Sequence, residues 1–258
     1  MSFVDEGYEI VSLTGNAQVL LAKTVRELER EFGDLTTYHD RRPANEEKAL
    51  ADHAKAAATC KDVVRRVIEE HLEFFRRLIG ADMMIQSKPY LRISRPGVET
   101  DNIGFHRDTW YGDTPYECSV WMPLTDTDMG NSLQVAPGSH VWAEKAHPTE
   151  RTARPDVPKG SVKHSLGFIY ENPKQLVSPC EMRPIPLKLG QMVVFSLALL
   201  HGQEVNRSTR TRFSLDCRLA NAMANIRLGR SRDAAYYERF VTSPVTQAAL
   251  AYEKANAK

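Results

Sequence analysis

The period of the hydrophobic pattern changes once along this chain, near Gly80. In the stretches 21–32 and 64–79, apolar side chains recur every three or four residues, which is the spacing of one face of an α-helix. After Gly80, apolar residues form short runs separated by Pro, Gly, Asn and Asp, as in RPG and KLGQ. This second pattern predicts short β-strands joined by turns. Helices followed by many short strands restrict the chain to few architectures.

The expected strands cover residues 83–93, 116–124, 132–135, 192–195 and 211–219. They predict a mainly β fold with flanking helices (α+β), built on a double-stranded β-helix core of the jelly-roll, cupin-like kind. We expect this core over about residues 82–220, the helices of about 14–80 packed outside it, and a C-terminal helical segment over about 232–258 that Pro244 interrupts. The proline-containing stretch 141–183 is expected to be a long loop. Loops of this length inside a compact domain usually serve as lids or binding loops. Without a repeat or linker, residues 1–258 are expected to form one domain.

Composition argues against several classes of partner. Lys plus Arg (34) nearly balances Asp plus Glu (33), so the chain lacks the basic field that drives binding to nucleic acid or anionic membranes. The first residues show no leader pattern and no run of about 18 apolar residues occurs, so we expect a cytoplasmic protein with no membrane partner. The four cysteines include no CxxC and predict neither a zinc cluster nor a disulfide framework. We expect a small-molecule substrate, and these residues do not predict the oligomeric state.

The segment GFHRD carries two potential metal ligands, His106 and Asp108. In an extended strand, side chains two apart share a face, so both are expected to point into the interior. The best candidate for a third ligand is His201, at the end of the apolar run 192–200. Two histidines and one carboxylate on one side of a metal leave positions open, as in non-haem Fe(II) oxygenases. An HxD pair is by itself weak evidence, and the alternative is a solvated strand end.

A potential carboxylate-binding pair follows His201 at Arg212 and Ser214. These residues are two apart, so they share a face of the expected strand 211–219. A guanidinium matches a carboxylate with two parallel hydrogen bonds, and the hydroxyl can supply a third. Arg212 and Ser214 could therefore bind one carboxylate of a dicarboxylate co-substrate.

Together these residues resemble the phytanoyl-CoA dioxygenase (PhyH)-like family of Fe(II)/2-oxoglutarate-dependent oxygenases. The resemblance covers roughly residues 89–219 and rests on HxD, WMPLTD, GNSLQVAPGSH, the distal His201 and Arg212 eleven residues later. It implies a double-stranded β-helix, Fe(II) held by His106, Asp108 and His201, and 2-oxoglutarate and O2 as co-substrates, with Arg212 as the anchor of 2-oxoglutarate.

The same resemblance assigns two more residues to the co-substrate site. Trp121 stands where the family often has a tryptophan lining this site, although a buried strand aromatic is an equal alternative. Gln203 replaces the serine that family members often carry two residues after the distal histidine, and its amide can still donate to a carboxylate.

The resemblance implies oxidation of a C–H bond, with succinate and CO2 as co-products. We expect hydroxylation, with cyclisation or desaturation left open, and Asp108 argues against halogenation because related halogenases lack this carboxylate. Arg107, Trp110, Tyr111 and Asp113 are expected at the pocket mouth, where they could bind substrate, or else form ordinary loop packing. Because this expected pocket mouth is polar, it suits a small polar metabolite, such as a carbohydrate- or aminocyclitol-like intermediate of natural-product biosynthesis.

Two other functional classes stay open at this point. A cupin-like metal-binding isomerase, lyase or binding protein would use the same three ligands without 2-oxoglutarate, and would not need Arg212. A catalytically idle scaffold with a vestigial triad is the other alternative. Binding of Fe(II) and 2-oxoglutarate separates these classes from an oxygenase.

Overall fold

The computed structural model describes residues 2–41, 46–102, 104–111, 113–151, 174–177, 180–224 and 236–256. The first third is helical, as its periodicity predicts. The helices of this part are α1 (Phe3–Glu6), α2 (Gly15–Phe32), α3 (Glu46–Thr59), α4 (Val63–Glu70) and α5 (Leu72–Ile79). Gly33 ends α2 in the left-handed region, with φ 66°, where a residue without a Cβ is favoured.

Strands dominate after Gly80. They are β2 (Met83–Gln86), β3 (Tyr90–Ser94), β4 (Glu117–Pro123), β5 (Leu133–Val135), β6 (Thr149–Arg151), β7 (Lys174–Leu176), β8 (Arg183–Ile185), β9 (Gln191–Ser196), β10 (His201–Gly202), β11 (Arg212–Asn221) and β12 (Tyr237–Val241), with β1 (Tyr8–Ser12) before them. Short 3-10 helices lie between, namely η1 (Leu35–Asp40), η2 (Glu99–Asp101), η3 (Asp108–Tyr111), η4 (Ser139–Val141) and η5 (Glu144–Ala146).

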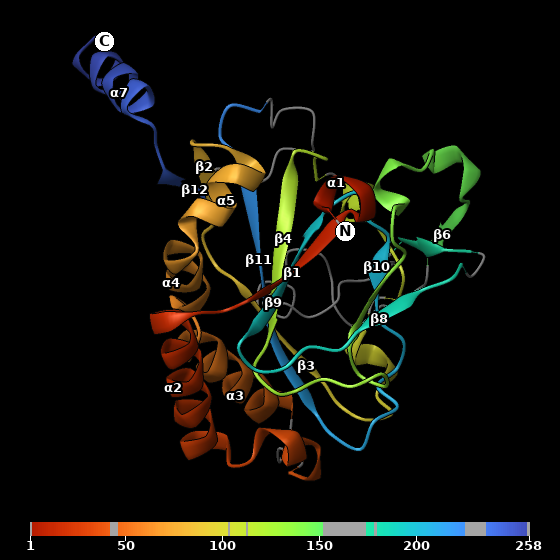
Figure 1. Ribbon diagram of the computed structural model, residues 1–258. Helices are drawn as coiled ribbons and strands as arrows, with labels where there is room; N and C mark the ends of the chain where they lie inside the picture. The colour runs from red at the N-terminus through yellow and green to blue at the C-terminus, as the bar shows by residue number, and fades with distance from the viewer. Residues whose placement is uncertain are drawn as a thin grey trace.

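Two antiparallel sheets carry most of these strands. The major sheet has the order β1-β9-β4-β11-β2-β12, and β3 also pairs with β11. The minor sheet has the order β10-β5-β8. In Figure 1 the minor sheet lies on one side of the major sheet, and α2 and α4 lie on the other. This arrangement of antiparallel sheets is consistent with the expected jelly-roll core.

Side-chain alternation divides the interior into two hydrophobic clusters. One contains Leu21 and Phe75 from the helices together with Leu91 and Leu215 from the major sheet. The other lies between the sheets and contains Trp121, Leu133, Val135, Ile185, Val193 and Phe195. The opposite face of β11, which carries polar residues at alternate positions, therefore points toward the space between the sheets.

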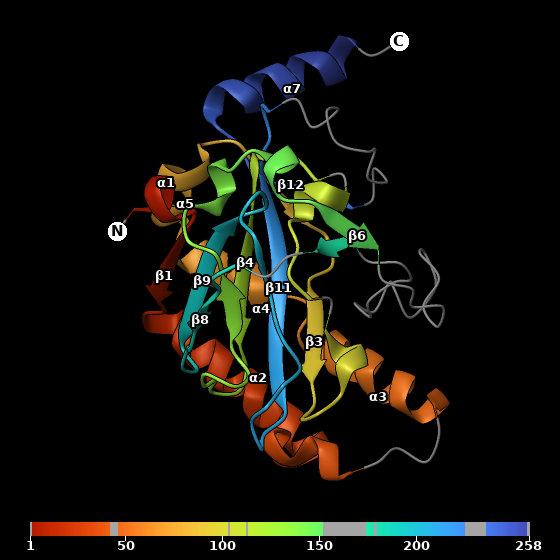
Figure 2. The same ribbon diagram turned by 90° about the vertical axis from the view of Figure 1, so that its right-hand side faces the viewer.

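The structure corrects the expected C-terminal helix. Residues 237–241, which we expected to be helical, form β12 and pair with β2 at the edge of the major sheet. Pro244 does not interrupt a helix but begins one, α7 (Pro244–Asn256). Proline is well tolerated at the first helical position, because its missing N–H would have no partner there. Both figures show α7 projecting beyond the end of the major sheet, and none of its side chains is buried (Figures 1 and 2).

The expected loop 141–183 contains more order than its composition indicates. Its described parts include η5, the β6–β7 pair and the start of β8. Residues 152–173 lie outside the described part of the chain. None of the described helices is long and apolar enough to cross a membrane.

Candidate active site

The two histidines of the predicted triad are direct cross-strand partners. His106 and His201 form an isolated antiparallel bridge in which each backbone N–H donates to the other residue's carbonyl, at 2.8 and 2.9 Å. Residues paired in this way project their side chains to the same face of a sheet. The ring centroids are accordingly 4.5 Å apart. The two ligands thus meet because of strand register.

Each histidine is also oriented through its other ring nitrogen. The Nδ1 of His106 lies 2.9 Å from the carbonyl oxygen of Gly104, and the Nδ1 of His201 lies 2.9 Å from that of Leu199. Since a carbonyl can only accept, each Nδ1 must carry the proton and each Nε2 keeps a lone pair for a metal. Burial lowers the pKa of His201 to about 4, so this ligand is neutral at physiological pH.

Asp108 completes the triad from a position that differs from the predicted one. We expected it in the same extended strand as His106, but it begins the 3-10 helix η3. Its Oδ1 lies 3.6 Å from His106 Nε2, and the potential ligand atoms of Asp108, His106 and His201 all lie within 4.8 Å of one another. Thr109 donates its N–H to Leu197, which ties η3 to the turn before His201.

Arg218 is a site residue that the sequence reasoning missed. Its Nη2 and Nε donate to Asp108 Oδ2 at 2.9 and 3.3 Å. Burial alone would raise the pKa of Asp108, but the charge of Arg218 holds it well below the usual range. Arg218 lies six residues after Arg212 on the same strand. The even spacing of the two arginines in β11 could have identified Arg218 from the sequence, because it places both guanidinium groups on the same face of the strand.

The predicted 2-oxoglutarate anchor, Arg212, is buried between the sheets. Its guanidinium carbon lies 5.3 Å from the ring centroid of Trp121. Its Nη1 donates to the carbonyl oxygen of Asn131 and to the side-chain oxygen of Gln203, and Gln203 in turn donates to Ser94. Trp121 is therefore both a buried strand aromatic and a neighbour of the predicted anchor.

Arg212 and Ser214 retain unused hydrogen-bonding capacity. Within the described residues, Arg212 Nε and Ser214 Oγ are buried without a hydrogen-bond partner, and no carboxylate lies within 4 Å of the Arg212 guanidinium. Burial, and the nearby charge of Arg92, lower the pKa of Arg212 to about 9. A buried cation of this kind favours a ligand that brings a carboxylate.

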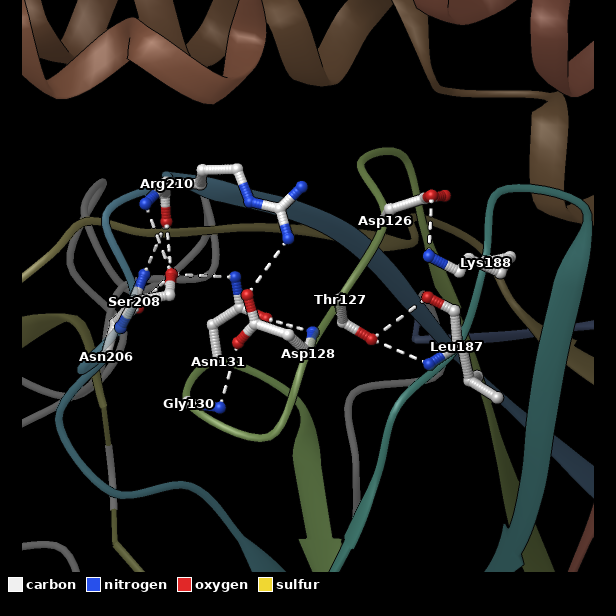
Figure 3. A network of polar contacts seen from close by, with 10 residues as sticks. All are labelled: Asp126, Thr127, Asp128, Gly130, Asn131, Leu187, Lys188, Asn206, Ser208 and Arg210. Carbon is white, nitrogen blue, oxygen red and sulfur yellow. Dashed lines mark hydrogen bonds and ion pairs between the residues drawn. The ribbon is translucent and has the colours of Figure 1, made fainter.

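A polar network behind Asn131 fixes the carbonyl that accepts from Arg212 (Figure 3). Asn131 Oδ1 accepts from the backbone N–H of Asp128 at 2.8 Å, and Asn131 Nδ2 donates to Ser208 Oγ at 3.0 Å. Arg210 forms an ion pair with Asp128 at 2.9 Å. These contacts join the β4–β5 turn to the β10–β11 loop, so they fix Asn131 from both segments (Figure 3).

The four residues predicted at the pocket mouth lie in different surroundings. Arg107 donates to the backbone carbonyls of Ser139 and Trp142 at 2.6 and 3.2 Å, so its guanidinium binds the η4 turn. Asp113 is buried and its Oδ2 lies 3.6 Å from Arg218 Nε. Tyr111 and Trp110 are partly buried on η3, and the Tyr111 ring centroid lies 5.5 Å from that of His106.

The donor set fits a divalent iron. Two imidazoles and one ionised carboxylate, all buried and converging, form the arrangement that leaves coordination positions open for co-substrates. On the neighbouring strand face, Arg212 and Ser214 offer unsatisfied donors for a carboxylate. The combination suits a metal-dependent reaction that also uses a dicarboxylic acid.

Comparisons with known proteins agree with this chemistry. The sequence profile of the family described as Phytanoyl-CoA dioxygenase (PhyH) matches residues 2–214. A search of curated protein sequences found no match.

Several solved structures share the fold. The epimerase SnoN, solved in complex with Fe3+, alpha ketoglutarate and nogalamycin RO, aligns with a TM-score of 0.54 and 15% identity, covering 94% of this chain and 93% of SnoN. A nickel complex of the non-haem monooxygenase ThoJ aligns with a TM-score of 0.52 and 20% identity, covering 98% of this chain and 93% of ThoJ. The alpha ketoglutarate-dependent carbocyclase SnoK from nogalamycin biosynthesis aligns with a TM-score of 0.50 and 15% identity, covering 93% and 94%.

Proposed function

Because this chain belongs to the phytanoyl-CoA dioxygenase (PhyH) family and is a non-haem Fe(II)/2-oxoglutarate-dependent dioxygenase, we propose that it oxidises a C–H bond of a small polar metabolite. Hydroxylation is the proposed outcome, with cyclisation or desaturation as further outcomes of the same hydrogen abstraction. The observation that carries the proposal is the convergence of three potential ligand atoms within 4.8 Å, with both histidines oriented through Nδ1.

In this proposal each residue has a distinct part. His106, Asp108 and His201 hold iron, and Arg212 and Ser214 bind the distal carboxylate of 2-oxoglutarate, with Trp121 and Gln203 placing the guanidinium. When bound, iron supplies the oxidative decarboxylation of 2-oxoglutarate to succinate and CO2 and the removal of a substrate hydrogen atom.

The surroundings of the triad contribute orientation and exclusion of water. The hydrophobic cluster between the sheets, which includes Trp121 and Phe195, covers one side of the site, and the Phe195 ring centroid lies 4.6 Å from that of His201. A dry site strengthens the interaction of Arg212 with a carboxylate.

The proposed substrate side is built on η3. Tyr111 offers a flat face beside His106, and Trp110 precedes it on η3. Asp113 is buried against Arg218, and Arg107 binds the η4 turn. Aromatic faces with polar groups suit a hydroxylated or cationic molecule, such as a carbohydrate- or aminocyclitol-like intermediate of natural-product biosynthesis. SnoN, which shares the fold, was solved in complex with nogalamycin RO.

Three broader predictions accompany this function. We propose that residues 1–258 form one domain, and that the helices before Gly80 support a double-stranded β-helix from outside, since the two parts share a hydrophobic cluster. Location in the cytoplasm stays a prediction from the sequence.

The first test is the anaerobic addition of Fe(II) and 2-oxoglutarate to the metal-free protein. The chelate should give a weak visible absorption band, which His106→Ala should abolish while leaving the fold intact. Screening small polar molecules for stimulated succinate release would then identify the substrate. Absence of the band in the wild-type protein would favour an idle scaffold.

Substitution of Arg212 separates the oxygenase from a cupin-like metalloprotein. We expect Arg212→Ala to weaken 2-oxoglutarate binding by roughly 10- to 100-fold, since hydrogen bonds to charged groups contribute about 1.5–3 kcal/mol. Arg207→Ala removes an exposed arginine from the same part of the chain and is the matched control. Unchanged 2-oxoglutarate binding in Arg212→Ala would exclude the assigned role.

A further inference from the structure

Arg218 makes a two-point contact with one oxygen of a metal ligand. Both Nη2 and Nε donate to Oδ2 of Asp108, whereas Oδ1 is the oxygen that faces His106 Nε2 at 3.6 Å. The side chains of Arg218 and Asp108 are 13% and 6% exposed, so water competes little for this contact. The two carboxylate oxygens therefore have different partners.

We propose that Arg218 is a positioning residue for the iron ligand Asp108. It occupies Oδ2 with two hydrogen bonds, so that Oδ1 is the carboxylate oxygen that would hold the metal. This inference rests on the proposed function. An arginine is suited to the task, because two N–H groups of its planar fork can converge on one oxygen while its charge compensates that of the carboxylate.

The C-terminal strand holds Arg218 in turn. The remaining amino group, Nη1, donates to the hydroxyl oxygen of Tyr236 at 2.6 Å. The backbone carbonyl of Tyr236 accepts from both the N–H and the hydroxyl of Ser87, each at 2.9 Å, which fixes the start of β12. Asp113, at 3.6 Å from Arg218 Nε, provides a second negative neighbour.

This support lies beyond the part of the chain that matches the family, which ends at residue 214. Arg218 and Tyr236 both follow that limit. A segment outside the matched part of the chain thus contacts the residue that orients Asp108. Partners that orient metal ligands typically change metal affinity by 10- to 100-fold when they are removed.

The experiment measures anaerobic binding of Co(II), as a spectroscopic substitute for Fe(II), to wild-type protein and to Arg218→Met, Arg218→Lys and Tyr236→Phe. We expect Arg218→Met to bind Co(II) roughly 10- to 100-fold more weakly and to change its visible absorption spectrum, because the carboxylate is no longer held. Arg218→Lys, which keeps the charge but lacks the fork, and Tyr236→Phe should show smaller changes in the same direction.

Arg92→Met is the matched control. Arg92 is an arginine on the neighbouring strand β3 and forms a comparable ion pair with Asp216 at 2.7 Å. Its loss should lower thermal stability without changing the Co(II) spectrum. An Arg218→Met protein with wild-type Co(II) affinity and spectrum would overturn the proposal. Should this variant fail to fold, an unchanged spectrum in both Arg218→Lys and Tyr236→Phe would overturn it instead.

His106→Ala distinguishes this result from failure of the proposed function. If wild-type protein and His106→Ala bind Co(II) equally, the triad is not the metal site and both proposals fail. If His106→Ala loses binding while the Arg218 and Tyr236 variants keep the wild-type affinity and spectrum, only the positioning role fails.

Chemical rescue by formate tests the same contact between Arg218 and Asp108 independently. Asp108→Gly leaves the guanidinium of Arg218 without the carboxylate and beside the vacated ligand position. Formate should therefore strengthen Co(II) binding by Asp108→Gly, and should not do so in the double variant Asp108→Gly/Arg218→Met. Equal responses of the two variants to formate would contradict the assignment of Oδ2 to Arg218.

Discussion

At the scale of single residues, the backbone beside the triad is as constrained as the ligands. Gly202 follows His201 and has φ 158°. A Cβ built at this position would collide with the carbonyl oxygen of Gly104, on the segment that carries His106. The glycine therefore allows the two ligand-bearing segments to approach closely enough to form their bridge.

Gly202→Ala should separate these segments and weaken metal binding at least tenfold, because a shift of the His106–His201 bridge moves both imidazoles. Anaerobic Co(II) titration measures the effect. Gly97→Ala is the control, since Gly97 also has positive φ, 69°, but an added Cβ would meet nothing within 4 Å. Wild-type affinity in Gly202→Ala would show that the close approach is not required.

At the scale of elements, β11 separates two environments. Its residues Leu215 and Phe213 face the cluster shared with the helices, while Arg212, Ser214 and Arg218 occupy the alternate positions. One strand thus stabilises the fold with one face and carries site residues on the other.

Leu215→Ala should lower the free energy of unfolding by about 2–5 kcal/mol, because the side chain is fully buried between β3 and β4 and its removal leaves a cavity. Denaturant unfolding of the metal-free protein measures the loss. Val19→Ala, at a position 65% exposed on α2, should change stability by no more than about 0.5 kcal/mol. Equal effects of the two substitutions would contradict the assignment of Leu215 to the core.

The helix α7 represents the opposite case, since it buries no side chain. Before its first residue, Ser243 donates its N–H and hydroxyl to Asp82 at 2.7 and 2.9 Å, and its Oγ accepts from the N–H of Thr246. A helix with so little packing depends on its end contacts.

We expect backbone amides of α7 to exchange hydrogen much faster than those of α2, whose Leu21 and Leu28 are fully buried. Ser243→Ala should accelerate exchange in α7 further and leave α2 unchanged, which hydrogen exchange with mass spectrometry resolves. Protection of α7 equal to that of α2 would mean that the helix packs against something else in solution.

At the scale of the whole molecule, the predicted metal ligands are connected to both sheets. His106 adds to the minor sheet beside β10, and Arg218 connects Asp108 to the major sheet. A metal held by the triad would therefore join both sheets.

Metal binding should raise the melting temperature. A ligand that binds only the native state, at a free concentration 100 times its Kd, raises the free energy of unfolding by about 2.7 kcal/mol. This corresponds to a rise of roughly 5–10 °C in melting temperature for a chain of this size. Anaerobic thermal unfolding with and without Fe(II) measures the shift, and a chelator should reverse it. His201→Ala should show no shift; an identical shift in that variant would place the stabilising metal elsewhere.

The sequence was sufficient for features that depend on local pattern. The change of period at Gly80 indicates helices and then strands, and the order of His106, Asp108, His201 and Arg212 indicates the family. The segment 237–241 shows where local pattern fails. It has a helical spacing, yet pairing with β2 makes it a strand, because tertiary contacts override weak propensity.

By itself, the sequence determined the ligand chemistry, because residue types and their spacing state which atoms can bind a metal or a carboxylate. The tertiary structure alone decided that His106 and His201 are register partners and that Arg218 holds Asp108. These relations depend on which strands pair and in what register. Pairing is decided by the burial of whole sheet faces, so no local stretch of sequence specifies it.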